Sequence, residues 1–193
     1  MALQWDELEA GLEDRARQIR AQLGIDEALT RIGRPTLTGS AALRVMVAHD
    51  IDLTVAVTKL DSQSVDAVAG LGAKLATRPD VRVVTFRNDI GHWNTDPGYP
   101  DGLYLFVECT EDVGDVWTLD IWFVDEPDRQ PDLQHVQSLR PRIDPVTQAA
   151  ILAIKRATNG RRPDGTRLPS FEIYQAVLDR GVRTPEEFAQ TCR

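Results

Sequence analysis

The chain has few of the residues that mark disulfide-rich, exported or membrane proteins. Its 193 residues include only two cysteines, Cys109 and Cys192, which are too few for a disulfide framework. The longest apolar run is far shorter than the roughly 20 residues of a membrane helix, so we expect no membrane segment. The acidic N-terminus lacks the basic and apolar regions of a signal peptide. We therefore expect a cytoplasmic protein with reduced thiols.

Several common catalytic and cofactor-binding motifs are also missing. The three histidines, at 49, 92 and 135, are scattered and do not have the spacing of zinc ligands. The sequence contains no Walker loop, no Rossmann glycine run and no Gly-x-Ser-x-Gly hydrolase elbow. These absences argue against a zinc enzyme, a P-loop enzyme, a dinucleotide-binding enzyme and a serine hydrolase.

The composition is that of an ordinary globular protein, but the charge is unevenly distributed. Hydrophobic residues make up 42% of the chain and charged residues 27%, which predicts one domain or one domain with a small helical appendage. The net charge is −8, with 12 basic and 23 acidic residues in 1–130 and 10 basic and 7 acidic residues in 131–193. The acidic part disfavours general affinity for nucleic acid, and the basic part leaves room for a phosphate-bearing substrate. The asymmetry is equally compatible with no functional meaning.

Hydrophobic periodicity predicts alternating helices and strands followed by helices only. We expect strands at 36–38, 51–57, 81–86, 103–109 and 116–124, and helices at 5–23, 25–32, 41–48 and 64–76. Residues 125–141, with their prolines and aspartates, are predicted to form a linker. Asp144 and Pro145 are typical of a helix start, and further helices are expected at 171–180 and after Thr184. This order predicts an α/β fold with a mixed sheet flanked by helices and a C-terminal helical segment.

The most informative pattern is a glycine-serine corner followed by two aspartates. Gly39 and Ser40 precede a predicted helix, for which Ser40 is the expected N-cap, and Asp50 and Asp52 begin the next strand. Side chains at i and i+2 of a strand point the same way, so the two carboxylates converge and repel unless a cation lies between them. Mg²⁺ typically takes one or two carboxylates plus substrate phosphates. A glycine-serine corner before a helix offers a phosphate close backbone approach, a hydroxyl and amide groups.

This arrangement resembles the signature of the nucleotidyltransferase superfamily, over about Pro35 to Asp125. The sequence around these residues most resembles that of small bacterial members, of the antibiotic-modifying or RNA-modifying toxin type. The resemblance implies a catalytic core at 35–125, between an N-terminal helical segment at 1–34 and a C-terminal helical segment at 142–193. It also implies a third carboxylate on a later strand. Asp120 is our candidate. Asp115 and Asp125 are weaker alternatives, because both lie at strand ends.

The implied activity is metal-dependent transfer of a nucleoside monophosphate from a nucleoside triphosphate, such as ATP, to a hydroxyl. Asp50, Asp52 and Asp120 are expected to bind one or two Mg²⁺ ions, and Asp120 can instead act as a general base. Gly39 and Ser40 are expected to bind the leaving phosphates. Lys155, from the helical part, and Arg44, one turn after Ser40, are further candidates for phosphate binding.

Three questions stay open at the level of sequence. The acceptor is either a small hydroxylated molecule, towards which the acidic core leans, or an RNA end, which Arg161 and Arg162 keep open. A protein partner such as an antitoxin is compatible with toxin-type relatives, but no residue indicates one. The alternative function is a nucleotidyltransferase-like module that binds a nucleotide or a partner without turnover.

The loop at 87–102 is unusually aromatic for a surface connection. Trp93 and Tyr99 lie in it among glycine, proline and polar residues. Because loops often carry functional residues, these rings are candidates for stacking on a base or on an acceptor ring. The alternative is that they cover a small satellite hydrophobic cluster.

Overall fold

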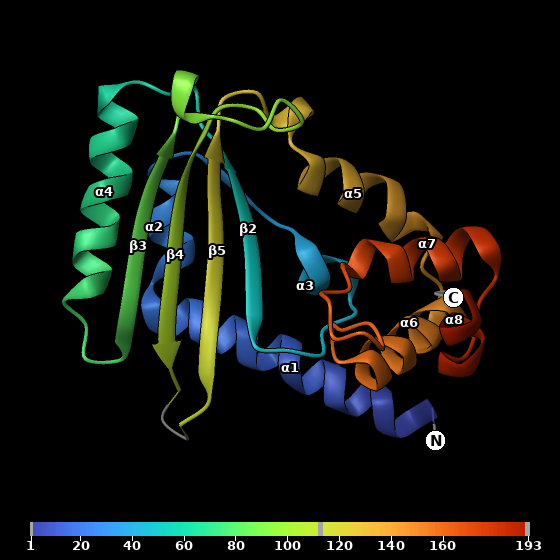
Figure 1. The fold of residues 1–193 in the computed structure, drawn as a ribbon. Coiled ribbons are helices and arrows are strands. Elements are labelled where there is room, and N and C mark those ends of the chain that lie inside the picture. Colours follow the sequence, from blue (N-terminus) through green and yellow to red (C-terminus); the bar gives the residue numbers. More distant parts are fainter. Residues whose placement is uncertain (1, 112–113, 192–193) are drawn as a thin grey trace.

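The structure, a computed structural model, describes residues 2–111 and 114–191, and Cys192 therefore lies outside the described residues. It contains one mixed sheet with helices packed against it (Figure 1). The strands are β1 (Arg34–Leu37), β2 (Asp50–Ala56), β3 (Val81–Asp89), β4 (Gly102–Thr110) and β5 (Val116–Val124). The helices are α1 (Ala2–Leu23), α2 (Ile25–Thr30), α3 (Gly39–Leu43), α4 (Ser62–Ala76), α5 (Pro131–Leu139), α6 (Pro145–Thr158), α7 (Ser170–Arg180) and α8 (Pro185–Thr191). Short 3₁₀ turns are η1 (Gly91–Trp93), η2 (Pro127–Arg129) and η3 (Arg140–Arg142).

The sheet has the strand order β1-β2-β5-β4-β3 over the described part of the chain. β2 and β5 are parallel neighbours, and the other adjacent pairs are antiparallel. The predicted mixed sheet flanked by helices is therefore confirmed. The pairing of β2 with β5 matters most for function, because it places the Asp50–Asp52 strand beside the strand that carries Asp120.

The two faces of the sheet differ sharply in polarity. Ile51, Leu53, Leu119 and Ile121 are at most 2% exposed and pack in one hydrophobic cluster with residues of α1, α2 and α4. The alternate positions on β2 and β5 point to the opposite face, because side chains alternate along a strand. That opposite face carries Asp50, Asp52, Thr54, Thr118, Asp120 and Trp122. Burial of one face thus orients the carboxylates on the other.

The helix after the glycine-serine corner is shorter than predicted. α3 ends at Leu43, and Arg44 adopts a left-handed backbone with φ 62°, so the expected helix at 41–48 was too long. The expectation for Ser40 was also wrong, because Thr38 occupies the N-cap position and Ser40 lies within the helix. The amide of Val45 donates back to the carbonyl of Ser40 at 2.9 Å, which closes the turn.

The segment predicted as a linker at 125–141 is largely helical. It contains η2, α5 and the start of η3. Pro131 is the first residue of α5, a position where proline is favoured because its missing amide proton has no helical partner. Reading this proline as a sign of a linker was therefore wrong.

The C-terminal helices form a second hydrophobic cluster, which also includes Leu43 and Val45. These two residues belong to α3 and the short turn that follows it, residues 39–46, here called the α3 turn. At the start of α6, Asp144 accepts a hydrogen bond from the amide of Thr147 at 2.8 Å, which confirms the predicted helix start. Three side chains from the C-terminal part donate to carbonyls of the α3 turn: Arg140 to Ala42, Gln148 to Arg44 and Lys155 to Val45. The α3 turn thus joins the sheet to α6 and α7. The division into segments at 1–34, 35–125 and 142–193 stays a prediction.

Within the described ranges, none of the helices combines the length and the apolar character that a membrane crossing requires.

Candidate active site

The carboxylates of the sequence motif lie on two adjacent strands. Asp50 and Asp52 share one face of β2, and Asp52 is the direct register partner of Asp120 on β5. Neighbouring strands are about 4.8 Å apart, so the side chains of Asp52 and Asp120 start close together on the same face. The two carboxylate alternatives are engaged elsewhere. Asp115 pairs with Arg15, and Asp125 accepts a hydrogen bond from the amide of Leu60 at 3.2 Å.

Gly39 packs directly against Asp52. Its φ of 58° lies in the left-handed region, and a Cβ added to it would fall 1.8 Å from Asp52 Oδ2. Both the backbone conformation and the lack of space therefore require glycine at this position. The amide of Thr38 also donates to the carbonyl of Asp52 at 2.9 Å. The glycine-serine corner and the aspartate pair thus form one local structure.

Ser40 presents an unusual polar group to the interior. The residue is 7% exposed, and its hydroxyl is buried with no hydrogen-bond partner among the described residues. A buried hydroxyl without a protein partner is costly, and a bound ligand that forms a hydrogen bond with it would offset that cost. Its place beside Gly39 agrees with the phosphate-binding role expected from the sequence, which stays a prediction.

Burial makes the aspartate pair electrostatically unfavourable. Burial, followed by the negative charges of Asp50 and Asp120, raises the pKa of Asp52 to about 7. Burial also raises the pKa of Asp50, although the positive charge of Lys155 opposes this shift. Both carboxylates are therefore short of positive charge, which is the condition under which a bound cation stabilises a site.

Asp120 has a partner that sequence analysis missed. The hydroxyl of Tyr104, on β4, donates to Asp120 Oδ1. Burial, and then this hydrogen bond, raises the pKa of Tyr104, so the hydroxyl remains a donor at neutral pH. The alternation along β4 indicates which face Tyr104 occupies. Its contact with Asp120 depends on the pairing of β4 with β5, which sequence alone did not provide.

Lys155 reaches the site from α6. It is 8% exposed, its Nζ donates to the carbonyl of Val45 at 2.8 Å, and it lies 5.9 Å from the ring centroid of Tyr174. A cavity of about 200 Å³ is lined by both Lys155 and Asp50, together with Asn159 and Ser170. The structure therefore brings Lys155 to the same hollow as the first carboxylate of the motif.

Arg44 is not brought to the carboxylates. Its side chain is 67% exposed and faces Glu13 of α1, with 3.9 Å between Nε and Oε1. Its left-handed backbone ends α3, so its side chain leaves the helix in a direction that a continued helix would not give. The phosphate-binding role expected for Arg44 stays a prediction, and the described contacts do not favour it.

The donor set fits a hard divalent cation held partly by other ligands. In the part of the chain that the structure describes, no three His, Cys, Asp or Glu side chains are grouped closely enough to hold a metal ion by themselves. Mg²⁺ usually takes one or two protein carboxylates and completes its shell with water and substrate phosphate oxygens. Asp50 and Asp52, buried and short of positive charge, match that requirement, and Asp120 is the candidate third ligand.

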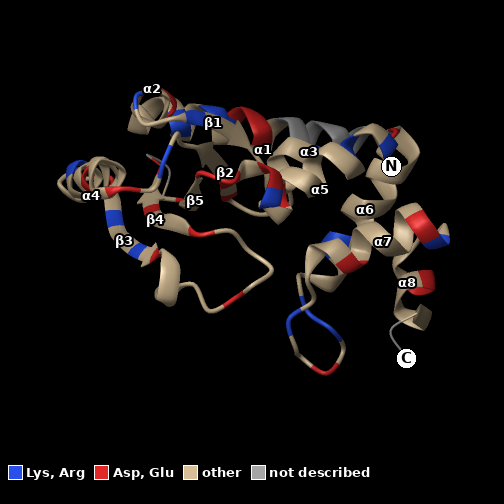
Figure 2. Ribbon diagram, turned by 90° about the horizontal axis from the view of Figure 1, so that it is seen from above, with Lys and Arg blue, Asp and Glu red and all other residues tan. Residues whose placement is uncertain are grey.

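The central strands and the loop between α6 and α7 carry charges of opposite sign. Acidic positions occur on the central strands, and basic positions gather on the loop between α6 and α7 (Figure 2). In that loop Arg162 binds both carboxylate oxygens of Glu172 at 2.7 Å, and Arg161 donates to the carbonyl of Gly165 at 3.1 Å.

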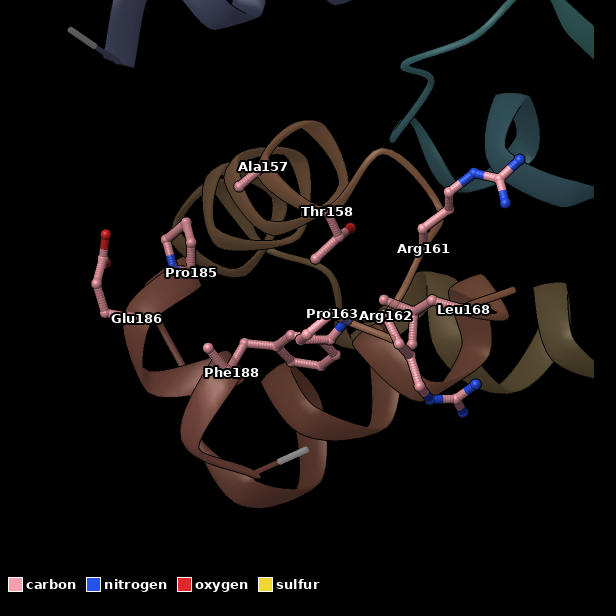
Figure 3. A pocket seen from close by; sticks show the side chains of 10 residues that line it. Ala157, Thr158, Arg161, Arg162, Pro163, Leu168, Pro185, Glu186 and Phe188 are labelled. Carbon is pink, nitrogen blue, oxygen red and sulfur yellow. The ribbon is translucent and has the colours of Figure 1, made fainter. Parts of the chain in front are cut away.

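A cavity of about 450 Å³ lies between this loop and α8, where Phe188 and Leu168 line it (Figure 3). Arg161 and Arg162 line that cavity, but none of the predicted carboxylate or phosphate-binding residues does.

The fold is similar to that of solved structures of an RNA terminal U-transferase and of Cid1. A cytoplasmic RNA terminal U-transferase superposes with a TM-score of 0.54 at 14% identity, covering 91% of this chain and 53% of that chain. Cid1 with its short product ApU gives 0.55 at 13% identity, covering 90% and 53%. The Cid1 poly(U) polymerase bound to MgATP gives 0.55 at 15% identity, covering 91% and 55%. The chain thus spans about half the length of these structures, and the likeness shows the fold alone. No family model and no curated protein matches the chain.

Proposed function

We propose that the protein is a metal-dependent nucleotidyltransferase that moves a nucleoside monophosphate from a nucleoside triphosphate to an acceptor hydroxyl. One observation carries this proposal. The turn containing Gly39 packs against Asp52 so closely that no side chain fits, and Asp52 in turn pairs in register with Asp120. The glycine-serine corner, to which we assign phosphate binding, is therefore joined to an acidic centre, on a fold similar to that of solved nucleotide-transferring enzymes.

In this reaction the acceptor oxygen attacks the α-phosphorus. A bond forms between that oxygen and phosphorus, the bond from the α-phosphorus to the bridging oxygen breaks, and pyrophosphate leaves with the electron pair. The acceptor proton passes to the Asp120 carboxylate, whose Oδ1 is held by Tyr104. The chain's contribution is mainly positioning and charge stabilisation, since phosphoryl chemistry depends on both.

The other site residues have separate roles in binding the metal and the phosphates. Asp50 and Asp52 would hold Mg²⁺, which when bound neutralises phosphate charge and makes the acceptor hydroxyl more acidic. The amides at Gly39 and the hydroxyl of Ser40 bind the leaving phosphates, and Lys155 contributes positive charge from the 200 Å³ cavity beside Asp50. The similar Cid1 structures contain a UTP analogue, MgATP or ApU, which supports a nucleoside triphosphate as substrate. A cytoplasmic location remains a prediction from sequence.

Pyrophosphate release tests the proposal. Purified protein, Mg²⁺ and each of the four ribonucleoside triphosphates are incubated with pools of hydroxylated small molecules and with short RNA. We expect pyrophosphate from the wild type and a loss of at least a hundredfold in Asp52→Asn. Asp66→Asn is the matched control, because Asp66 is an exposed residue of α4 and α4 packs on the other face of the sheet.

A non-catalytic nucleotide-binding module is the second candidate. It is favoured by one observation, that the described residues hold no closed group of three metal ligands. This function predicts that nucleotide and Mg²⁺ raise the melting temperature while no acceptor pool yields pyrophosphate. Pyrophosphate that appears only when Asp50 and Asp52 are intact would reject it.

A further inference from the structure

Asp120 lies between two strands that make different demands on its carboxylate. The strand order β2-β5-β4 places Asp52 on one side of Asp120 and the strand of Tyr104 on the other. The hydroxyl of Tyr104 donates to Asp120 Oδ1, so this oxygen is directed toward β4 and away from β2. A cation held by the β2 carboxylates would therefore compete with Tyr104 for Asp120.

The ring of Tyr104 belongs to a ladder of three side chains that crosses the sheet. Its register partners are Arg87 on β3 and Trp122 on β5. The guanidinium of Arg87 lies 4.8 Å from the ring centroid of Tyr104 and 5.3 Å from that of Trp122, and the two ring centroids are 4.9 Å apart. Asp89 binds Arg87 at 2.7 Å. These contacts hold the tyrosine ring in place, and its hydroxyl reaches diagonally to Asp120, two residues before Trp122.

The three carboxylates share a face of the sheet but do not form one group. Register places Asp120 directly beside Asp52, and neighbouring strands are only about 4.8 Å apart. Even so, among the residues that the structure describes, no three acidic, histidine or cysteine side chains are close enough to hold one metal ion. The hydrogen bond from Tyr104 accounts for this separation, because it holds Oδ1 of Asp120 on the side away from Asp52.

We infer that Tyr104 is a positioning residue that keeps Asp120 out of the metal site and reserves it as the proton acceptor. Asp50 and Asp52 then hold the cation, and Asp120 presents its second oxygen, Oδ2, to the acceptor hydroxyl. A carboxylate that shares its lone pairs with a cation is a weaker base, so separating the two roles favours proton transfer. The role of Asp120 as base rests on the proposed function, whereas the effect of Tyr104 on metal binding does not.

Mn²⁺ binding without nucleotide tests the inference, because Mn²⁺ takes oxygen ligands as Mg²⁺ does and the free ion is measured by electron paramagnetic resonance. Tyr104→Phe keeps the ring and removes the hydroxyl, which frees Asp120 to turn toward β2. It should bind Mn²⁺ about tenfold more tightly than the wild type, at the lower end of the change that a hydrogen-bond partner of a metal ligand typically produces. Thr85→Val is the matched control, because it removes an exposed hydroxyl from the same face of β3 as Arg87 and should leave the affinity unchanged.

Two further variants identify the group that causes the gain. Tyr104→Phe combined with Asp120→Asn should lose the tighter Mn²⁺ binding, because the freed side chain is no longer a carboxylate. Asp52→Asn should weaken Mn²⁺ binding strongly, and Asp120→Asn alone should weaken it far less. The melting temperatures of all variants are compared with that of the wild type to verify folding.

Steady-state kinetics separate positioning from substrate binding. Tyr104→Phe should lower kcat at least about tenfold, as part of the roughly 10²- to 10⁴-fold that a positioned base contributes, and should leave the KM for the nucleoside triphosphate unchanged. Arg87→Met, which removes the charge over both rings, should lower kcat in the same direction but less. Arg82→Met is its control, because Arg82 on β3 also pairs with a carboxylate, Glu108, and should leave kcat unchanged.

The inference is overturned if Tyr104→Phe binds Mn²⁺ no more tightly than the wild type, if neither protein binds Mn²⁺, or if Asp120→Asn weakens binding as much as Asp52→Asn. It is also overturned if Tyr104→Phe raises KM and leaves kcat unchanged. Pyrophosphate release is measured independently of Mn²⁺ binding. Tighter Mn²⁺ binding by Tyr104→Phe, in a protein that releases no pyrophosphate with any acceptor, would reject the proposed function and retain the effect of Tyr104 on the metal site.

Discussion

At the scale of single residues, Gly39 is the position where sequence and site geometry are most tightly linked. We predict that Gly39→Ala destabilises the protein by more than the roughly 1–2 kcal/mol that a left-handed backbone costs a residue with a Cβ. The added methyl group would overlap Asp52 Oδ2, and such overpacking typically costs a further 1–3 kcal/mol or so. The free energy of unfolding, measured by denaturant titration, checks this prediction.

Gly24→Ala provides the matched control for that substitution. Gly24 has φ 62°, close to the 58° of Gly39, but nothing lies within 4 Å of its added Cβ. It should show the backbone cost alone and keep transferase activity. Equal destabilisation by the two substitutions would mean that the contact between Gly39 and Asp52 is looser than the structure shows.

Asp52 predicts how stability changes with pH. Its folded pKa of about 7 lies above its unfolded value of 3.8, so folding favours the protonated form. The stabilising contribution is fully present below about pH 4 and is lost as pH rises through about 7. In metal-free buffer we therefore expect the melting temperature to fall between pH 5 and pH 8. Mg²⁺ should raise it most at pH 8, because the cation binds the ionised pair.

Asp52→Asn should remove most of that pH dependence, since an amide does not titrate. It should also abolish the extra stabilisation by Mg²⁺ at pH 8, whereas Asp66→Asn should behave like the wild type. A pH dependence that persists unchanged in Asp52→Asn would assign it to other groups, and the electrostatic account of the site would then be wrong.

At the scale of elements, α6 is predicted to be the helix whose end most affects activity. Asp144 caps α6, which carries Lys155, and Asp61 caps α4 by the same capping-box geometry on the other side of the sheet. Asp144→Ala and Asp61→Ala should each cost about 1 kcal/mol of stability. Only Asp144→Ala should also reduce nucleotide turnover, because it loosens the helix that positions Lys155. Equal turnover in the two variants would show that α6 does not position the site.

The helices and strands were predictable to the extent that their signals are local. Alternation at 51–57 and 116–124 indicated which face of each strand is buried, and Asp144 with Pro145 indicated the start of α6. The prediction of helices and loops failed where one residue type occurs in two kinds of local structure. Pro131 begins a helix instead of marking a linker, and Arg44 ends α3 with a left-handed backbone that is uncommon for arginine.

The candidate site was only partly predictable for a related reason. Gly39, Ser40, Asp50 and Asp52 belong to one short segment, so their proximity follows from a turn and a strand. The contacts of Asp120 with Tyr104, and the charge of Asp132 near Asp52, depend on strand order and on where α5 packs. Neither is encoded in local spacing. Asp132 in particular lay in a segment read as a linker, so no local signal marked it.

At the scale of the whole molecule, the described residues contain two hydrophobic clusters that meet at the α3 turn. Met46 belongs to the cluster beneath the sheet, and Leu43, three residues earlier, belongs to the cluster of the C-terminal helices. Because one short turn contributes to both, and because three side chains of the C-terminal part bind its carbonyls, we predict a single cooperative unfolding transition in calorimetry.

Leu43→Ala and Met46→Ala test this prediction in the same experiment. Leu43 is 3% exposed and Met46 is fully buried, so each truncation should cost about 2–5 kcal/mol. If the clusters unfold together, both variants shift the same single transition to lower temperature. If calorimetry shows two transitions, with Leu43→Ala moving one and Met46→Ala the other, the sheet and the C-terminal helices are independent folding units. The α3 turn would then be a hinge between them, and the position of Lys155 relative to Asp50 would depend on that hinge.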